Sequence, residues 1–432
     1  MNSSASPGPV SRRQFLRTAG ALGAVLATSQ SPGIFAQGTP SKRVRIAVIG
    51  LNRGLAHLDS YVQLRDVEVV AVCDADERRI ATAIERVGVK TGQRPAGVKD
   101  FRRLLERPDL DAVSIAMPNF WHAPAAILAC SAGKHVYVEK PGSHNAREAE
   151  LIVAAARHHR RFVQMGNQRR SMPLFRQAID ELHSGIVGPL RSARCWYDAD
   201  RISIGHGQRT PVPAWLDYSL WQGPAPERPY VDNLVHYNWH WRWHWGGGEL
   251  ANNGIHTLDL ARWGLGVDRP RSVTCHGGRY HFKDDQETPD TILAGYDFGA
   301  ASVTWDGSSC APRKAEMHPL VTFYGDGGSV ALDEAHYTIV DLAGKTVRQV
   351  TGATDSLSHF SNFIQTIRGQ AALNSEIAEG QRSTLLCHLG NLAWRTRATL
   401  AIDGTTGHIQ HPTREQQRLW SREYRRGWEP RI

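Results

Sequence analysis

Five short apolar runs between residues 44 and 166 constrain the fold of this chain more than any other feature. They read "VRIAVIG", "VEVVAVCD", "DAVSIAMP", "HVYVEKP" and "RFVQMG". Helical patterns such as "APAAILACSAG" fill the intervals between them. Strands that are apolar throughout and alternate with helices indicate a parallel sheet with helices on both faces. The sequence therefore predicts a doubly wound α/β domain over residues 42–165.

The pattern changes in the second half of the chain. Runs such as "PLRSARCWYDA", "TILAGYDFG", "ASVTWDG" and "LVTFYGDGG" follow one another through short turns. They predict a large, predominantly antiparallel sheet that is open on one face. A connection rich in proline, glycine and tryptophan spans residues 200–238, and helical patterns cover 355–370 and 376–402. Residues 166–432 are thus predicted to form an α+β domain.

The N-terminal segment has the pattern of an export signal. "SRRQFLRTAGALGAVLATS" pairs Arg12 with Arg13 ahead of a short apolar stretch, which is typical of a twin-arginine signal. We expect cleavage after Ala36, a signal over residues 1–36, use of the twin-arginine export machinery and a periplasmic or otherwise exported protein. The apolar run is too short to form a stable membrane helix, and no later stretch predicts a membrane span.

The charge and the cysteines argue against several classes of function. The net charge is +9, but Arg12, Arg13 and Arg17 belong to the signal and the other basic residues are spread out. We therefore expect no nucleic-acid partner. The six cysteines are scattered without a CxxC pair, which predicts neither a disulfide framework nor a metal site.

Polar residues at the strand ends suggest a dinucleotide site. In "GLNRGLAH", Gly50 can make the tight turn that brings pyrophosphate to a helix N-terminus, although Asn52 occupies the usual second glycine position. Asp74 ends the next strand, where a carboxylate binds ribose hydroxyls and favours NAD over NADP. Alternatively, Asp74 caps the following helix, and Asp76 then interacts with its dipole. Further strand ends are "MPNFWHA" and "HVYVEKP". The predicted cofactor-binding residues are Gly50, Asn52, Arg53, Gly54, Asp74, Pro118, Asn119, His122, Glu139 and Lys140.

The motifs "AGKHVYVEKP", "MPNFWHAPAAILAC", "GNQRRS" and "GGGELANNGIHTLDLARW" resemble those of the glucose–fructose oxidoreductase/inositol dehydrogenase (Gfo/Idh/MocA) family. The resemblance implies a Rossmann domain, hydride transfer between NAD and a sugar or polyol, and a C-terminal sheet through which a homo-oligomer forms. Carried over to this sequence, its catalytic residues are Lys140, His256 and position 252. Asn252 stands where the family commonly has aspartate. At helical spacing Asn252, His256 and Asp259 share a face, so Asp259 is a candidate to orient the histidine.

The segment "NWHWRWHWGGG" allows two interpretations. If it is extended, indoles occupy one face and His240, Arg242 and His244 the other. Most of these indoles are expected in the core. One or two could instead line a sugar site next to the glycines. The candidate substrate-binding residues are Gln168, Arg169, His240, Trp241 and Arg242.

These features predict an exported, NAD-dependent oxidoreductase that acts on a sugar, glycoside or polyol with a tightly bound cofactor. A glycosidase or lyase that works by transient oxidation and elimination is the alternative. It ranks lower because known NAD-dependent glycosidases of this fold carry different local motifs. A sugar-binding protein without turnover is a further alternative, suggested by Asn252. The products distinguish the three: a keto-sugar, a cleaved glycoside or unchanged sugar.

Overall fold

The computed structural model describes residues 43–432, so the twin-arginine segment and the predicted cleavage after Ala36 lie outside the described residues. The predicted parallel sheet is confirmed, with strand order β3-β2-β1-β4-β5-β6 and parallel pairing throughout. This order reverses direction between β1 and β4, which is where ligands bind in doubly wound sheets. The strands are β1 (Val44–Ile49), β2 (Val67–Cys73), β3 (Ala96–Val98), β4 (Ala112–Ile115), β5 (His135–Val138) and β6 (Val163–Met165).

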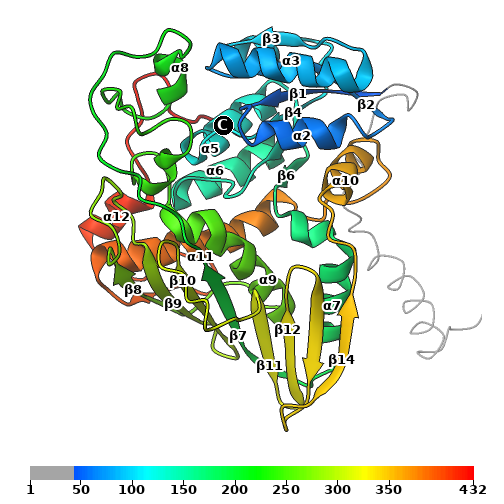
Figure 1. Cartoon of the computed structure of the whole chain (residues 1–432), viewed down its shortest axis with the longest axis vertical. Helices are drawn as coiled ribbons and strands as arrows, with labels where there is room; N and C mark the ends of the chain where they lie inside the picture. The colour runs from blue at the N-terminus through cyan, green and yellow to red at the C-terminus, as the bar shows by residue number, and fades with distance from the viewer. Residues whose placement is uncertain (1–42) are drawn as a thin grey trace, which may run out of the picture. The chain divides into compact units, whose positions relative to one another are not determined.

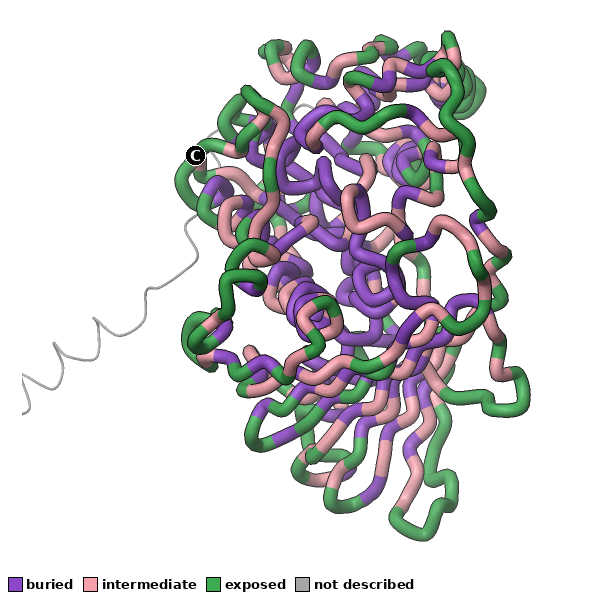
Figure 2. Tube along the Cα trace, turned by 90° about the vertical axis from the view of Figure 1, so that its left-hand side faces the viewer, coloured by how far each residue is buried: buried purple, intermediate pink, exposed green. Residues whose placement is uncertain are grey.

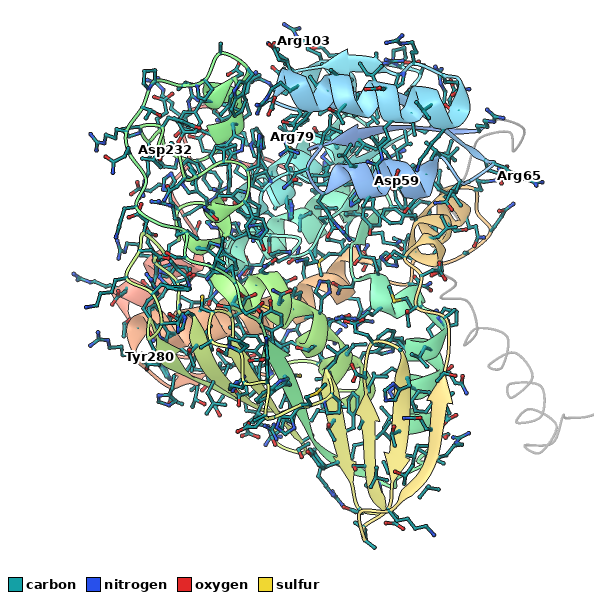
Figure 3. The ribbon with its side chains drawn as sticks, viewed as in Figure 1. Asp59, Arg65, Arg79, Arg103, Asp232 and Tyr280 are labelled. Carbon is teal, nitrogen blue, oxygen red and sulfur yellow. The ribbon has the colours of Figure 1, made fainter. Side chains whose placement is uncertain are left out.

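Helices follow each of the first five strands (Figure 1). On the surface, Asp59 of the first helix pairs with Arg86 and Lys90 of the next, which joins the two helices (Figure 3). The carboxylate of Asp76 accepts a hydrogen bond from the backbone of Arg78 and caps the second helix. The alternative role of Asp74 as the cap of this helix is therefore wrong. The helices are α2 (Gly54–Tyr61), α3 (Glu77–Thr91), α4 (Arg102–Leu105), α5 (Asn119–Ser131) and α6 (Ala146–His158).

The second sheet is also as predicted, with strand order β14-β13-β12-β11-β7-β10-β9-β8-β15. The pair β10–β7 is parallel and the other pairs are antiparallel. Exposed and buried residues alternate along its strands (Figure 2), as expected for a sheet covered on one face. The strands are β7 (Leu190–Asp198), β8 (Ser272–Gly278), β9 (Thr291–Asp297), β10 (Ser302–Ser308), β11 (Val321–Gly325), β12 (Gly328–Leu332), β13 (His336–Val340), β14 (Thr346–Thr351) and β15 (Leu400–Ala401).

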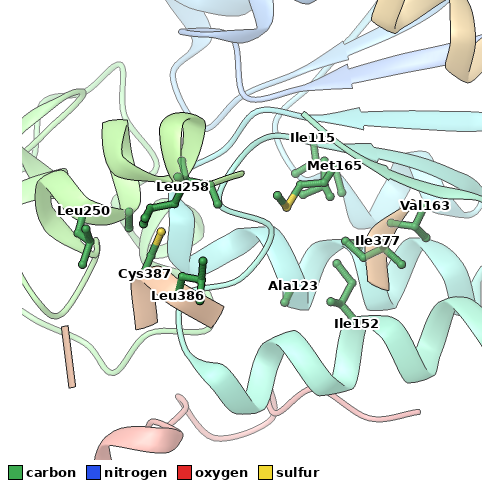
Figure 4. Packing of buried hydrophobic residues seen from close by; sticks show 14 of the residues in the cluster. Ile115, Ala123, Ile152, Val163, Met165, Leu250, Leu258, Ile377, Leu386 and Cys387 are labelled. Atoms are coloured by element: carbon green, nitrogen blue, oxygen red, sulfur yellow. The ribbon is translucent and has the colours of Figure 1, made fainter. Parts of the chain in front are cut away.

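Three helices cover the buried face of this sheet: α7 (Pro173–His183), α9 (Ile255–Leu265) and α11 (Ile377–Thr396). The helix α11 also packs against α6 and β6 of the first half. Its residues Ile377, Leu386 and Cys387 join Met165 and Leu258 in one continuous apolar core (Figure 4). The two sheets are therefore held together by shared packing, and a site between them has rigid walls.

The tryptophan-rich segment does not form the extended strand that its alternation allowed. Asn238–Trp241 is a short 3₁₀ helix, and a turn follows it. Trp239, Trp241 and Trp245 are buried, so the interpretation as core holds for these indoles. The predicted helical patterns near the end of the chain become α10 (Leu357–Ile367) and α11, and α8 (Tyr218–Gln222) and α12 (Arg414–Trp420) complete the described helices. None of the described helices is long and apolar enough to cross a membrane.

Candidate active site

A cavity of about 600 Å³ lies at the carboxyl ends of β1, β2, β4 and β5, where the sequence placed the dinucleotide. It extends to the π-helical turn Leu250–Gly254 and to α9 from the second half of the chain. Thirteen of the predicted site residues line it: Gly50, Asn52, Arg53, Asp74, Pro118, Asn119, His122, Glu139, Lys140, Gln168, His240, Asn252 and His256.

The turn after β1 requires a glycine. Gly50 has a φ of +86°, and a Cβ on it would lie 2.6 Å from the backbone of Ala116 and Met117. Gly54 begins α2, and a Cβ there would lie 3.0 Å from Val48. Gly50 therefore lets the chain turn beside the cavity, whereas Gly54, which is not among the cavity-lining residues, allows close packing of helix on strand.

Asp74 is partly buried at the end of β2. One carboxylate oxygen accepts from the backbone of Leu51 at 2.6 Å, and the other accepts from the backbone of Asp76 at 2.9 Å. Burial raises the pKa of Asp74, although these two hydrogen bonds oppose the effect. Each oxygen retains a further lone pair for a ribose hydroxyl. The geometry of this carboxylate and of Gly50 fits an adenosine dinucleotide.

An arginine also lies close to this carboxylate. Arg79 of α3 (Figure 3) hydrogen bonds to Asn52 of the glycine turn, 3.3 Å away, and its charge lowers the pKa of Asp74. An arginine at this place can bind the 2′-phosphate of NADP by donating hydrogen bonds to it, whereas the carboxylate of Asp74 repels that phosphate. With a cofactor bound, Asp74 and Arg79 would therefore act in opposite directions on the choice between NAD and NADP.

Glu139 is a buried carboxylate in the wall of the cavity, and several hydrogen bonds converge on it. It accepts hydrogen bonds from His57 and Gln168 at 3.0 Å and from the backbone of Lys140 at 3.1 Å, and Arg53 lies 3.4 Å away. Burial would raise its pKa, but His57, Arg53 and Lys140 together hold it well below the usual range. Glu139 thus remains ionised and fixes the strand end that carries Lys140.

His57, which lies on α2, was not among the residues predicted from the sequence. Its other ring nitrogen is 2.9 Å from the hydroxyl of Ser114, to which Tyr61 also donates at 3.2 Å. These buried hydrogen bonds connect α2 to Glu139, and through it to the strand end that carries Lys140. A polar residue on the buried side of α2 was the available signal.

His122 also has a supporting position. One of its ring nitrogens is 2.5 Å from the carbonyl of Pro141, and the other is 2.6 Å from the carbonyl of Met117. The ring therefore joins the ends of β4 and β5, and burial lowers its pKa.

Lys140 reaches across the cavity to the second half of the chain. Its Nζ donates to the backbone carbonyl of Asn252 at 2.6 Å and to the side-chain oxygen of the same residue at 3.1 Å. Burial lowers the pKa of Lys140, and the carboxylate of Glu139 raises it in opposition. A lysine with a lowered pKa can exchange a proton near neutral pH.

His256 faces the same cavity from the first turn of α9. Burial lowers its pKa well below the ordinary value, and the charges of Lys140 and Arg169 act in the same direction. Among residues 43–432 its ring has no hydrogen-bond partner. The neutral imidazole is therefore available to a ligand hydroxyl.

Two residues that the sequence reasoning missed lie here as well. Tyr237 lines the cavity together with Asn252, and burial raises its pKa. His236 lies 3.0 Å from Asp76, near Asp74. Beside Tyr237, the ring of His240 stacks on Trp239 at a centroid distance of 3.6 Å, and burial lowers its pKa to about 3. His236 and Tyr237 come from the irregular connection, where no local motif marks them.

Four other predicted residues have structural partners and are not among the residues that line this cavity. Asp259 accepts from Arg170 at 2.8 Å and from Ser383 at 2.6 Å, so it is not placed to orient His256. Arg169 pairs with Glu334. Trp241 is fully buried beneath Arg201. Arg242 pairs with Asp285 at 2.9 Å.

Three curated or solved proteins illustrate what the chain is similar to. A glycosyl hydrolase family 109 protein of Shewanella pealeana is 34% identical over 168 residues, which cover 34% of this chain and 37% of the relative. An alpha-N-acetylgalactosaminidase of Shewanella oneidensis is 31% identical over 169 residues, with the same coverage. The chain thus spans less than half the length of these curated relatives. The WlbA dehydrogenase of Bordetella pertussis, solved with NADH and UDP-GlcNAcA, has a TM-score of 0.63 and 18% identity, and covers 84% of this chain and 99% of its own.

Sequence profiles of known families cover most of the chain. The profile of the twin-arginine signal sequence matches residues 9–29, which indicates export. The profile for the oxidoreductase family with an NAD-binding Rossmann fold matches residues 44–167, and that for its C-terminal alpha/beta domain matches residues 196–430. The resemblance read from the motifs is confirmed, and the chain belongs to the Gfo/Idh/MocA oxidoreductase family.

Proposed function

We propose that this protein oxidises a carbinol carbon of a sugar, glycoside or polyol, with NAD held in the cavity described above. The observation that carries the proposal is the meeting of Lys140 with Asn252 and His256 in a cavity that also contains Asp74 and the Gly50 turn. The candidate proton-transfer group and the candidate dinucleotide site thus share one cavity. NAD supplies a hydride acceptor when it is bound.

Lys140 is the group that receives the hydroxyl proton. Burial favours its neutral form, and the two oxygens of Asn252 hold the Nζ in place without adding a negative charge. The amine therefore has a lone pair to offer at a pH well below the ordinary lysine pKa. Glu139 below it stays ionised and keeps the lysine backbone fixed.

His256 and His240 line the same space as neutral imidazoles, because burial lowers the pKa of both. A neutral imidazole can donate to one sugar hydroxyl or accept from another. Trp239 and Tyr237 add aromatic surface to the wall, which suits the apolar face of a sugar ring.

A second candidate, hydrolysis of a glycosidic bond by transient oxidation, is favoured by the names of the curated relatives. Oxidation of a ring hydroxyl acidifies the neighbouring C–H. A base removes that proton, the glycosidic C–O bond breaks and the departing alcohol takes up a proton. Water then adds, and the hydride returns to the carbonyl carbon, so no net oxidation remains. This route needs a further acid or base beside Lys140, and Tyr237, which lines the same cavity, is the candidate.

Incubation of the purified protein with a panel of free sugars and aryl glycosides distinguishes the candidates. Mass spectrometry that finds a keto-sugar two mass units lighter supports net oxidation. Release of the aryl alcohol without a change in NADH absorbance supports the glycosidase. Deuterium incorporated from D₂O into recovered sugar reports the C–H exchange that only the second route requires. Unchanged sugars throughout, with sugar binding by calorimetry, would leave a binding protein.

A further inference from the structure

The last residues of the chain return to the cofactor domain. After α12, residues 421–432 cross from the second sheet to α5, where the C-terminus lies (Figure 1). Three anchors hold this tail. Arg422 donates to Glu148 at 2.8 Å and to the carbonyl of Phe120 at 2.6 Å, and Tyr424 donates to Glu148 at 2.8 Å. The tail thus donates most of the side-chain hydrogen bonds that the buried carboxylate of Glu148 accepts.

A third anchor lies further along. The backbone of Arg425 donates to the carbonyl of Pro224 at 3.0 Å, and its guanidinium pairs with Glu227 at 2.8 Å. Both partners belong to the long connection between the two halves. The tail is therefore bonded to this connection, and the two segments lie together against the Rossmann domain.

The tail places Trp428 in the wall of the cavity. Its indole packs edge-on against Trp121, with ring centroids 5.3 Å apart, and Trp121 packs in the same way on Phe101. The guanidinium of Arg102 lies 4.5 Å from the centroid of the Trp428 ring. Trp428, Trp121 and Phe101 all line the cavity, together with Lys99 and Asp100.

This aromatic wall belongs to the adenine end of the cavity. Asp100 follows β3, the edge strand next to β2, and Asp74 ends β2. Lys140 follows β5, on the other side of the point where the strand order reverses. With the ribose held at Asp74, the base would lie beyond it toward β3 and the nicotinamide toward β5. Flat aromatic surfaces bind a nucleobase by stacking.

We propose that residues 421–432 form a latch over the adenine end of the cofactor, with Trp428 as an adenine-binding residue. Release of the dinucleotide then requires the tail to detach from Glu148 and Glu227, which makes dissociation slow. This inference rests on binding of NAD by the Rossmann domain and does not depend on which sugar reaction follows.

The decisive variant is Trp428→Ala, compared with Trp420→Ala as a matched control. Trp420 lies on α12, where it donates to Glu150 and is not among the residues that line the cavity. Calorimetry measures binding of NAD, ADP-ribose and nicotinamide mononucleotide to apoprotein. We expect Trp428→Ala to weaken NAD and ADP-ribose by about tenfold or more while leaving the mononucleotide unchanged. The Trp420→Ala protein should bind all three like the parent.

A second pair of variants tests the latch without changing Trp428, the residue proposed to contact adenine. Arg425→Ala removes an anchor, whereas Arg426→Ala changes a neighbouring exposed arginine with no ion pair among the described residues. Stopped-flow displacement of bound NADH should show faster release from Arg425→Ala and an unchanged rate for Arg426→Ala. Parental ADP-ribose affinity in folded Trp428→Ala, or equal losses for all three ligands, would overturn the proposal. Sugar turnover by these loaded variants tests the proposed function separately.

Discussion

Lys140 and Asn252 form the contact that joins the two halves of the active site: the Nζ lies 2.6 Å from the backbone carbonyl and 3.1 Å from the side-chain oxygen of Asn252. Both acceptors are neutral. Asn252 therefore positions the lysine without placing a charge beside it, and burial has the largest effect on the pKa of Lys140. An aspartate at the same place would hold the lysine equally well but would favour its protonated form.

Lys140→Met should abolish most turnover while NAD binding persists. The methionine fills a similar volume but has no proton to exchange, so we expect a loss of about 10²-fold or more in kcat. Steady-state kinetics and NADH fluorescence titration measure the two quantities on one preparation. Near-parental turnover would remove Lys140 from the chemistry.

Asn252→Asp should move the pH dependence of turnover to higher pH. The added carboxylate raises the pKa of Lys140, and a base that must be neutral then becomes active only at higher pH. The acidic limb of the kcat profile should shift upward, and the plateau should remain. Asn252→Leu serves as the comparison, since it removes the hydrogen bond without adding charge. A profile that is the same in Asn252→Asp and the parent would contradict a proton-transfer role for Lys140.

The strand ends could be predicted from sequence because a parallel sheet brings them to one edge, and Gly50, Asp74 and Lys140 duly line one cavity. Asp259 could not be placed by helical spacing alone. The π-helical turn Leu250–Gly254 changes the register ahead of α9, and Arg170 and Ser383 bind the carboxylate from distant segments. Trp428 meets Trp121 across some three hundred residues, a contact that no local pattern encodes. Tyr237 likewise depends on the path of an irregular connection.

Asp74→Ala should weaken NAD and relax discrimination against NADP. The variant loses an acceptor for ribose hydroxyls and a repulsion toward a 2′-phosphate, while Arg79 remains nearby. Asp59→Ala is the matched control, because Asp59 pairs with Arg86 and Lys90 on the surface, is not among the residues that line the cavity and should leave the cofactor preference unchanged. The ratio of Kd values for NADP and NAD is the measurement. An unchanged ratio in Asp74→Ala would show that other residues set the preference between NAD and NADP.

Glu139→Gln should lower the free energy of unfolding at pH 7 and alter its dependence on acid. The pKa of Glu139 in the folded protein lies below the ordinary 4.5. Its stabilising contribution is therefore complete above that pH and is lost as the pH falls toward the folded value. We expect a loss of about 3 kcal/mol at pH 7, because a buried partner of His57 loses its charge.

Urea unfolding of both proteins between pH 7 and pH 3 measures this difference. The gap between parent and Glu139→Gln should narrow as the pH falls below about 4.5. A gap that stays constant over this range would mean that the ionised form of Glu139 adds no stability.

NAD should enter this protein before export and stay bound during turnover. The twin-arginine pathway carries folded proteins, and free nicotinamide cofactor is scarce outside the cytoplasm, so a dissociable cofactor would leave the exported enzyme idle. Retention over hours requires nanomolar affinity or tighter, near −12 kcal/mol. The measurement is purification of the exported protein without added cofactor, then denaturation and chromatography of the supernatant. We expect about one nicotinamide per chain, and the same content in a cytoplasmic control in which Arg12 and Arg13 are replaced by lysine. Exported protein that emerges empty and turns over only with added NAD would show that the cofactor is acquired outside.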